Sequence, residues 1–210
     1  MDSINSHKED APEYDRQARE WGWNPEVIFG LMYPYIKAGQ KLLDVGIGTG
    51  LCSQPFHKAG IKVFGFDGSE EMLEICRYKR IAVDLKQHDM EAIPWPYANA
   101  TFDHAICGGV LHFFSELALF FNEAAHLLKP KGVWGFTVSH LLSGEIAADY
   151  TKVLDKASGV PMYIHSHDYI TQLLEEHNFS LQKQLVFLAS VNPESKAEHY
   201  GKLYIAQKSK

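Results

Sequence analysis

The chain has 210 residues, of which 46% are hydrophobic, and its formal net charge is −6. This length and composition are typical of a globular domain with a sizeable core. The acidic balance argues against the broad positive surface that nucleic-acid binding requires. The N-terminus lacks the apolar segment of a signal peptide, and no apolar run approaches the roughly 20 residues of a membrane helix. We therefore expect a cytoplasmic protein with neither a nucleic-acid nor a membrane partner.

Two helices are expected before the first strand, at Tyr14–Trp21 and Pro25–Lys37. Asn24 is a plausible cap of the second helix, with Pro25 at its first helical position. Helical stretches then separate five expected strands, which lie near residues 41–45, 61–66, 84–88, 102–107 and 132–138. This alternation predicts a mostly parallel sheet that is covered by helices on both faces.

The later boundaries are marked by local signals. Ser69 begins the helix after the second strand, and the segment 129–132 is expected to end a helix and turn into the next strand. In the tail, the segment 162–179 has Tyr169, Leu173 and Leu174 on one helical face, and Ser166 is the expected cap of that helix. The stretches LQKQLVFLAS and KLYIAQK predict two more strands, an antiparallel pair at the sheet edge.

A glycine-rich loop follows the first strand. The sequence KLLDVGIGTGL, residues 41–51, passes from an apolar strand through Asp44 to Gly46, Gly48 and Gly50. Glycines at these positions permit a tight turn and let a ligand come within contact distance of the main chain. A helix is expected beyond them, with Pro55 in its first turn, where free N–H groups favour an anionic group. A plain turn is the alternative.

An acid closes the second strand about 20 residues after this loop, at Asp67. Doubly wound nucleotide folds place an acid on the ribose hydroxyls at this interval. The spacing alone would also suit a nicotinamide-dependent enzyme. The glycines, however, follow the pattern D-x-G-x-G-x-G and not the G-x-G-x-x-G of dinucleotide sites, which favours a smaller nucleoside.

The motifs LLDVGIGTG, GFDGSEEML, QHDMEAIPW, FDHAICGGVLHFF and LLKPKGVWGF follow one another over about residues 41–138. In this order they resemble the class I S-adenosylmethionine (SAM)-dependent methyltransferases. The resemblance implies an α/β, Rossmann-like fold with a mostly parallel seven-stranded sheet and an antiparallel edge strand. It also implies a single domain over residues 1–210, with a helical cap or lid at 1–38 and the core at 39–210.

The resemblance assigns cofactor contacts to three motifs. Asp44 would order the glycine loop near the methionine part of SAM, and Asp67 would accept hydrogen bonds from the ribose diol. Asp89 would face the adenine amino group while Met90 lies against the ring. The alternatives are a strand-end acid, a turn aspartate, a polar turn and a core methionine, respectively. The expected cofactor residues in these motifs are Asp44, Gly46, Gly48, Gly50, Asp67, Gly68, Met72, Asp89 and Met90.

The fourth motif and the N-terminal region supply the remaining candidates. Cys107 and Gly108 end a strand where ligands of open α/β sheets bind. His112, in VLHFF, is either a buried structural residue or a group that takes a proton from the substrate. Tyr14 and Trp21 would fold over the cofactor, since aromatic faces suit a sulfonium cation, or else pack an amphipathic helix.

The expected activity is in-line transfer of a methyl group from SAM to a small-molecule acceptor, leaving S-adenosylhomocysteine (SAH). CGGV stands where amino methyltransferases of DNA and protein carry an NPPY-type tetrad. The three cysteines lack the spacing of a zinc site, and no metal is expected. A monomer or homodimer is expected. The alternatives are a catalytically silent SAM-binding regulator and a nicotinamide-dependent oxidoreductase.

Overall fold

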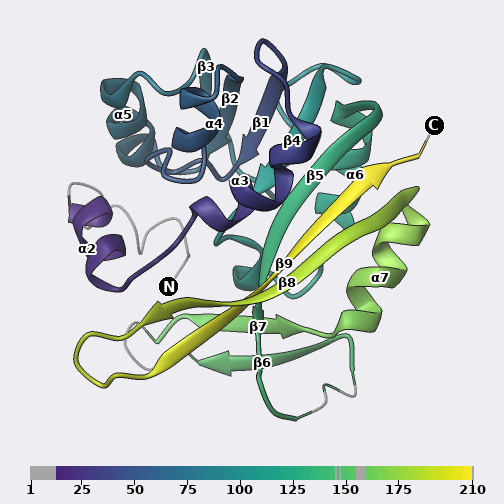
Figure 1. The fold of residues 1–210 in the computed structure, drawn as a ribbon. Helices are drawn as coiled ribbons and strands as arrows, with labels where there is room; N and C mark the ends of the chain where they lie inside the picture. Colours follow the sequence, from purple (N-terminus) through teal and green to yellow (C-terminus); the bar gives the residue numbers. More distant parts are fainter. Residues whose placement is uncertain (1–12, 145, 147, 155–158, 210) are drawn as a thin grey trace.

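A seven-stranded sheet with the strand order β3-β2-β1-β4-β5-β9-β8 organises the molecule (Figure 1). The computed structural model describes residues 13–144, 146, 148–154 and 159–209. Strands β1 to β5 pair in parallel, and β9 runs antiparallel to both of its neighbours, β5 and β8. This confirms the expected Rossmann-like fold class. The strands of this sheet are β1 (Lys41–Val45), β2 (Lys62–Asp67), β3 (Asp84–Gln87), β4 (Phe102–Cys107), β5 (Leu128–His140), β8 (Phe179–Val191) and β9 (Glu198–Lys208).

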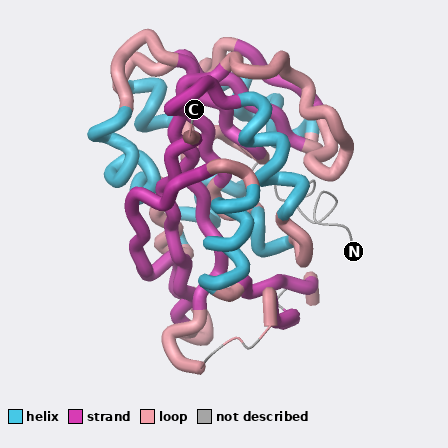
Figure 2. The backbone as a smooth tube through the Cα atoms, turned by 90° about the vertical axis from the view of Figure 1, so that its right-hand side faces the viewer, coloured by secondary structure: helices cyan, strands magenta, loops and turns pink. Residues whose placement is uncertain are grey.

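Helices lie on both sides of the sheet (Figure 2). One buried cluster joins the sheet to α3, α4 and α5, and a second joins it to α6 and α7. The helices are α2 (Tyr14–Glu20), α3 (Glu26–Met32), α4 (Gln54–Lys58), α5 (Glu70–Lys79), α6 (Ala118–Leu127) and α7 (His167–Glu176), with short 3-10 helices η2 (Tyr33–Tyr35) and η3 (Leu111–Phe113). Helix α2 packs no whole residue into the core and stands apart from the sheet, although the phenol of Tyr14 at its start is buried.

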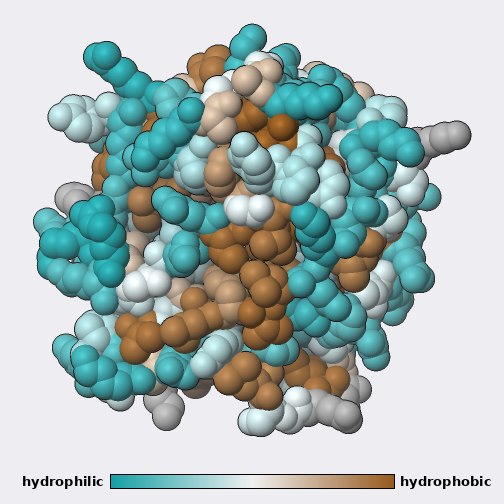
Figure 3. Space-filling model, in the orientation of Figure 1, coloured by the Kyte–Doolittle hydropathy of each residue, from teal (hydrophilic) through white to brown (hydrophobic). Residues whose placement is uncertain are grey.

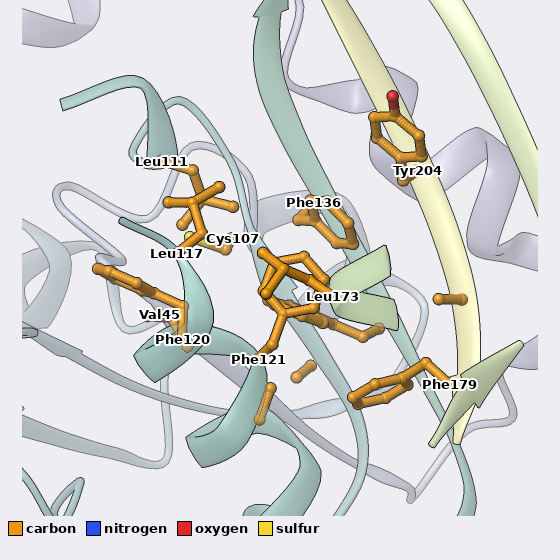
Figure 4. Close-up of a cluster of buried hydrophobic side chains, with 14 of the residues drawn as sticks. Val45, Cys107, Leu111, Leu117, Phe120, Phe121, Phe136, Leu173, Phe179 and Tyr204 are labelled. Atoms are coloured by element: carbon orange, nitrogen blue, oxygen red, sulfur yellow. The ribbon is translucent and has the colours of Figure 1, made fainter. Parts of the chain in front are cut away.

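Aromatic packing between α6, α7 and the sheet makes a rigid base for the strand ends (Figure 4). The ring of Phe121 lies 4.7 Å from that of Trp134 and 5.3 Å from that of Phe136, centroid to centroid. Leu173 of α7 lies beside Phe121 in the same cluster. Burying each such side chain contributes about 1.5–3 kcal/mol. The ends of β4 and β5 are therefore held in fixed positions.

The second N-terminal helix is shorter than expected. Helix α3 ends at Met32 instead of continuing to Lys37, and a 3-10 turn over Tyr33–Tyr35 follows it. Pro34 explains this end, because proline has no N–H to continue the helical hydrogen bonds and its ring clashes with the preceding turn. The cap position belongs to Pro25, and no side chain, including that of Asn24, caps the helix.

The second half of the chain differs in two details from what the sequence patterns indicated. The first part of the segment 162–179 was not recognised as a strand: residues 161–165 form β7, which pairs with β6 (Tyr150–Leu154), and helix α7 begins at His167. Ser166 does cap α7, accepting the N–H of Tyr169. The segment 129–132 lies within β5, where the register shifts between the pairs Phe102–Leu128 and His104–Val133.

Strand β8 forms the outer edge of the sheet and leaves several apolar side chains in solvent. Apolar side chains gather at the centre of the face drawn in Figure 3, where Figure 1 shows β8 and β9 crossing β7. The exposed apolar residues of β8 are Leu181, Leu185, Val186 and Leu188. The two strands continue beyond the sheet as a long hairpin, which reaches toward α2.

Candidate functional site

The carboxyl ends of β1, β2 and β4 meet at one edge of the sheet. Asp44 of β1 pairs with Gly65 of β2 on one side and with Ile106 of β4 on the other. Crossovers from β1 build the sheet toward β3, whereas β4 and β5 extend it the other way, so β1 and β4 flank a topological switch point. Ligands of open α/β sheets bind in the crevice at such a point.

The glycine loop after β1 contains one crowded glycine, Gly46, and one glycine that faces open space, Gly48. Gly46 has φ +70°, and a Cβ there would lie 2.7 Å from Val110 Cγ2 and 3.1 Å from Met90 Sδ. Gly48 has φ +51°, and its Cβ would meet nothing closer than Asp67 Oδ2 at 4.0 Å. The first glycine therefore lets the loop pack against Met90 and Val110, and the second leaves the main chain open to a ligand.

Asp67 joins the glycine loop to the end of β2. Its Oδ2 accepts the N–H of Gly48 at 2.8 Å, and its Oδ1 accepts the N–H of Ser69 at 2.9 Å. A carboxylate oxygen can accept more than one hydrogen bond. Asp67 thus holds the loop in place and presents acceptor oxygens to the same cavity.

Asp44 lies behind the loop and is only 1% exposed. Ser53 donates its hydroxyl to Asp44 Oδ2 at 2.7 Å. Burial raises the pKa of Asp44 to about 7, against the lowering effect of this hydrogen bond. The carboxyl group therefore anchors the far side of the turn between Gly46 and Ser53 and does not line the cavity.

A cavity of about 90 Å³ lies in front of the loop and the end of β4. Tyr14 lines this cavity, and burial raises the pKa of its phenol to about 12, so the phenol stays protonated at neutral pH. Seven expected cofactor residues are among those that line this cavity: Tyr14, Gly46, Gly48, Asp67, Met72, Met90 and Gly108.

A second cavity of about 390 Å³ adjoins the first. Its walls come from α2, η3, the end of β5, strand β7 and the β8–β9 hairpin. His112 and Trp21 line it, so these two predicted residues lie beside the larger cavity rather than the smaller one. The two cavities share four lining residues, Tyr14, Trp23, Gly109 and Phe113.

Helix α2 is fastened over this region at both of its ends. Asp15 accepts the hydroxyl of Thr49 at 2.6 Å and forms an ion pair with Lys79 of α5. The Lys79 ammonium also donates to the carbonyl of Thr49 at 2.9 Å. At the other end, the N–H of Val191 in β8 donates to the carbonyl of Trp21 at 2.7 Å. Within the stretch 1–38, which was expected to form a cap, helix α2 is thus held at both ends, while residues 1–12 lie outside the described residues.

Six predicted cofactor residues do not line the smaller cavity: Asp44 and Trp21, described above, and Gly50, Gly68, Asp89 and Cys107. Gly50 packs against α5, where a Cβ would lie 3.0 Å from Cys76 Sγ. Asp89 is exposed, and its carboxylate accepts the N–H of Glu91 at 2.9 Å in a local turn. Cys107 is fully buried within the core.

Sequence reasoning missed most of the larger cavity. Thr137 and Ser139 line it from the end of β5, and this position at a strand end was a usable signal. Thr137 Oγ1 accepts the N–H of Gly109 at 2.9 Å, which fixes the shared wall. Phe187 and His199 come from the terminal hairpin, and no motif marked them. Among the described residues, no three His, Cys, Asp or Glu side chains are placed to hold a metal ion.

Sequence comparison relates the chain to known methyltransferases. Residues 43–136 match the family described as Methyltransferase domain. The ubiquinone biosynthesis O-methyltransferase of Pelagibacter ubique is 26% identical over 160 residues, which is 63% of this chain and 64% of that protein. The demethylmenaquinone methyltransferase of Renibacterium salmoninarum is 32% identical over 120 residues, 57% of this chain and 50% of that protein. The chain thus spans about half to two thirds of the length of these relatives.

A solved methyltransferase structure has the same fold as this chain. The 1,6-didemethyltoxoflavin-N1-methyltransferase of Burkholderia thailandensis, solved with bound 1,6-didemethyltoxoflavin and SAH, superposes with a TM-score of 0.70 and 16% identity, covering 98% of this chain and 85% of that one. The sheet order and the loop at its switch point define an α/β protein with a class I methyltransferase fold. Residues 43–136, a little under half of the chain, are thus similar to the methyltransferase domain family, and the fold is that of the class I methyltransferases.

Proposed function

We propose that the protein transfers a methyl group from SAM to a small-molecule acceptor. The observation that carries this proposal is the adjacency of the two cavities, whose common wall is formed by Tyr14, Trp23, Gly109 and Phe113. A methyl donor in the smaller cavity and an acceptor in the larger one would face each other beside these shared residues, where the two cavities adjoin. Holding two reactants in line in this way supplies several kcal/mol of barrier lowering.

The residues around the smaller cavity fit SAM. Asp67 offers carboxylate oxygens for the ribose diol, and Met90 and Val110 offer apolar surface to the adenine ring. Tyr14 and Trp23 bring aromatic faces, which stabilise a sulfonium cation. Bound SAM would supply an electrophilic methyl group. The chain would orient the donor, exclude water by means of α2, and hold the acceptor opposite the departing sulfur.

His112 is the candidate group for removing a proton from the acceptor. It lies in η3, follows the shared wall in sequence, and lines the larger cavity. A base is needed only when the acceptor is protonated in its resting state, as a hydroxyl group is. Tyr14 is unsuited to this role, because its pKa is raised to about 12 by burial.

No helix among the described residues is long and apolar enough to cross a membrane. We propose that the protein acts in the cytoplasm, as a monomer or homodimer, within one domain over residues 1–210. The quinone-related names of its relatives support a small-molecule acceptor.

Calorimetric titration with SAM, SAH and NADH tests the proposed cofactor. We expect SAM and SAH to bind and NADH not to bind. Asp67→Ala should weaken both adenosyl compounds about tenfold or more, since it removes charge-assisted hydrogen bonds. The exposed Asp89→Ala variant is the matched control and should change affinity less. Tight binding of NADH, or binding of none of the three, would contradict the proposal. Binding of SAM with no methyl transfer to any acceptor would instead indicate a silent regulator.

A further inference from the structure

We propose that the larger cavity selects an uncharged, planar aromatic acceptor that carries a hydroxyl group. This inference rests on the proposed function, because it takes the cavity to be the acceptor site. It names the charge and shape of the acceptor, which neither the glycine loop nor the family defines.

We infer that the acceptor is uncharged from the residues that line the larger cavity. Among the described residues that line it, none is a Lys, Arg, Asp or Glu. The polar side chains are neutral amide and hydroxyl groups, together with His112 and His199. A carboxylate or phosphate placed here would lose its hydration without gaining a cationic partner, which is strongly unfavourable. An uncharged ligand avoids this cost.

We infer the planar shape of the acceptor from the packing of two aromatic rings in the cavity wall, those of Trp23 and Phe187. The Trp23 ring lies 3.3 Å from the position that a Cβ on Gly109 would take, and the Phe187 ring lies 2.9 Å from the corresponding position on Gly201. Both rings therefore rest on glycine main chain, where no side chain separates them from the backbone. Trp21 and Phe113 add further aromatic surface. Aromatic rings pack best against other rings in offset or edge-to-face arrangements, so a flat ring fits these walls.

We infer the hydroxyl group of the acceptor from the polar side chains near the residues that the two cavities share. The Thr137 hydroxyl accepts the N–H of Gly109, and its own O–H is a donor at this wall. Ser139 lies two residues further along β5 and also lines the cavity, as does His112. The two hydroxyl groups can hydrogen-bond an acceptor oxygen, and the imidazole of His112 can take its proton. On transfer, the oxygen–methyl bond forms as the sulfur–methyl bond breaks, and the hydroxyl proton passes to His112.

Three matched ligands test the charge selection directly: 2-naphthol, 6-hydroxy-2-naphthoate and 6-(aminomethyl)-2-naphthol. Binding to the full chain is measured at pH 7.5 with saturating SAH, by calorimetry and by quenching of tryptophan fluorescence. We expect 2-naphthol to bind about tenfold or more tighter than either charged analogue, because only the charged ligands lose hydration without a partner.

Arginine variants provide the complementary test. Ser190→Arg and Gln17→Arg each place a cation on the cavity wall from a different element, and should raise the affinity for 6-hydroxy-2-naphthoate about tenfold. Ser180→Arg, on β8 but outside the cavity lining, is the matched control and should leave all three affinities unchanged. Two variants are used so that misfolding of one leaves the test intact.

Equal or tighter binding of the carboxylate by the wild-type chain would overturn the inference. So would tighter binding of the ammonium compound, which would indicate an aromatic cage for cations, or no binding of any of the three. These outcomes are separate from failure of the proposed function. That failure appears as absence of SAM and SAH binding in titrations without acceptor, and the naphthol affinities measured without SAH would still report charge selection.

Discussion

Asp44 links the pH of the medium to the stability of the fold. Burial raises the pKa of its carboxyl group to about 7 from an ordinary value of 3.8. The folded state therefore retains a proton that the unfolded state releases between about pH 4 and pH 7. Stability from this group is fully present below about pH 4, falls as the pH rises, and is lost above about pH 7.

The Asp44→Asn variant should become more stable relative to wild type as the pH is raised from 5 to 8, since the amide does not ionise. Urea unfolding at the two pH values measures the change. Asp103→Asn is the control. Burial favours a raised pKa of Asp103, but hydrogen bonds from Lys129 and the Lys41 N–H outweigh it and lower the pKa. The group is thus ionised in both states throughout this interval, and its variant should show no such trend. A constant difference for Asp44→Asn would contradict the account.

Gly46 and Gly48 should respond differently to the same substitution. Gly46→Ala places a Cβ 2.7 Å from Val110 Cγ2, and a β-branched valine has few other rotamers to adopt. Gly48→Ala meets open space, so it carries only the cost of a positive φ, roughly 1–2 kcal/mol. We expect Gly46→Ala to lower the free energy of unfolding by about 1–3 kcal/mol more than Gly48→Ala. Equal losses in urea unfolding would show that Val110 moves aside freely.

The role proposed for His112 predicts a separation of rate from cofactor binding. With a hydroxylated acceptor, His112→Ala should lower kcat about 100-fold or more, in the range of general-base effects. The dissociation constant of SAM should stay within about twofold, because His112 does not line the smaller cavity. His199→Ala is the comparison variant within the same cavity and should reduce kcat less. Unchanged turnover of a folded His112→Ala protein would rule out the catalytic role.

At the level of elements, α2 is held by polar contacts rather than by a buried face. Apart from the phenol of Tyr14 it buries no side chain, and Asp15 joins it to Thr49 and to Lys79. Asp15→Ala should therefore release the N-terminal end of α2 while leaving the free energy of unfolding within about 1 kcal/mol of wild type. We expect faster tryptic cleavage at Arg16 and Arg19, and a severalfold faster release of SAH.

Glu70→Ala is the control for this prediction. It removes an exposed ion pair with Arg77 on α5 that does not touch α2. Cleavage and release rates of this variant should match those of wild type. If Asp15→Ala also leaves both rates unchanged, the contacts of Asp15 do not hold α2 over the cavities.

Sequence patterns predicted best those elements whose bounds are set by residues within or next to the element itself. Strands β1, β2 and β4 were expected within one residue of their observed bounds, because each is a short apolar run that ends at a glycine or an acid. Strands β6 and β7 were not foreseen, because each is stabilised by pairing with the other rather than by its own pattern. The early end of α3 was predictable from Pro34, which the helical periodicity around it obscured.

For the whole molecule, the smaller cavity follows from sequence and the larger one does not. Gly46, Gly48 and Asp67 lie at strand ends that a parallel sheet must bring together. The larger cavity depends on how α2, η3, β7 and the terminal hairpin pack, and residues as distant as Gln17 and Gly201 share its wall. Contacts of this range have no signature in local spacing. Asp89, which stands at a motif position, is exposed and accepts the N–H of Glu91 in a local turn, and its contact with the adenine stays a prediction.

The measurement that tests the account most directly is a crystal structure of the protein with SAH. We predict that the ribose hydroxyls lie within hydrogen-bond distance of the Asp67 carboxylate. The sulfur atom should face the wall formed by Tyr14, Trp23, Gly109 and Phe113, with the larger cavity beyond it. Binding of SAH elsewhere, or with its sulfur turned away from this wall, would contradict methyl transfer between the two cavities.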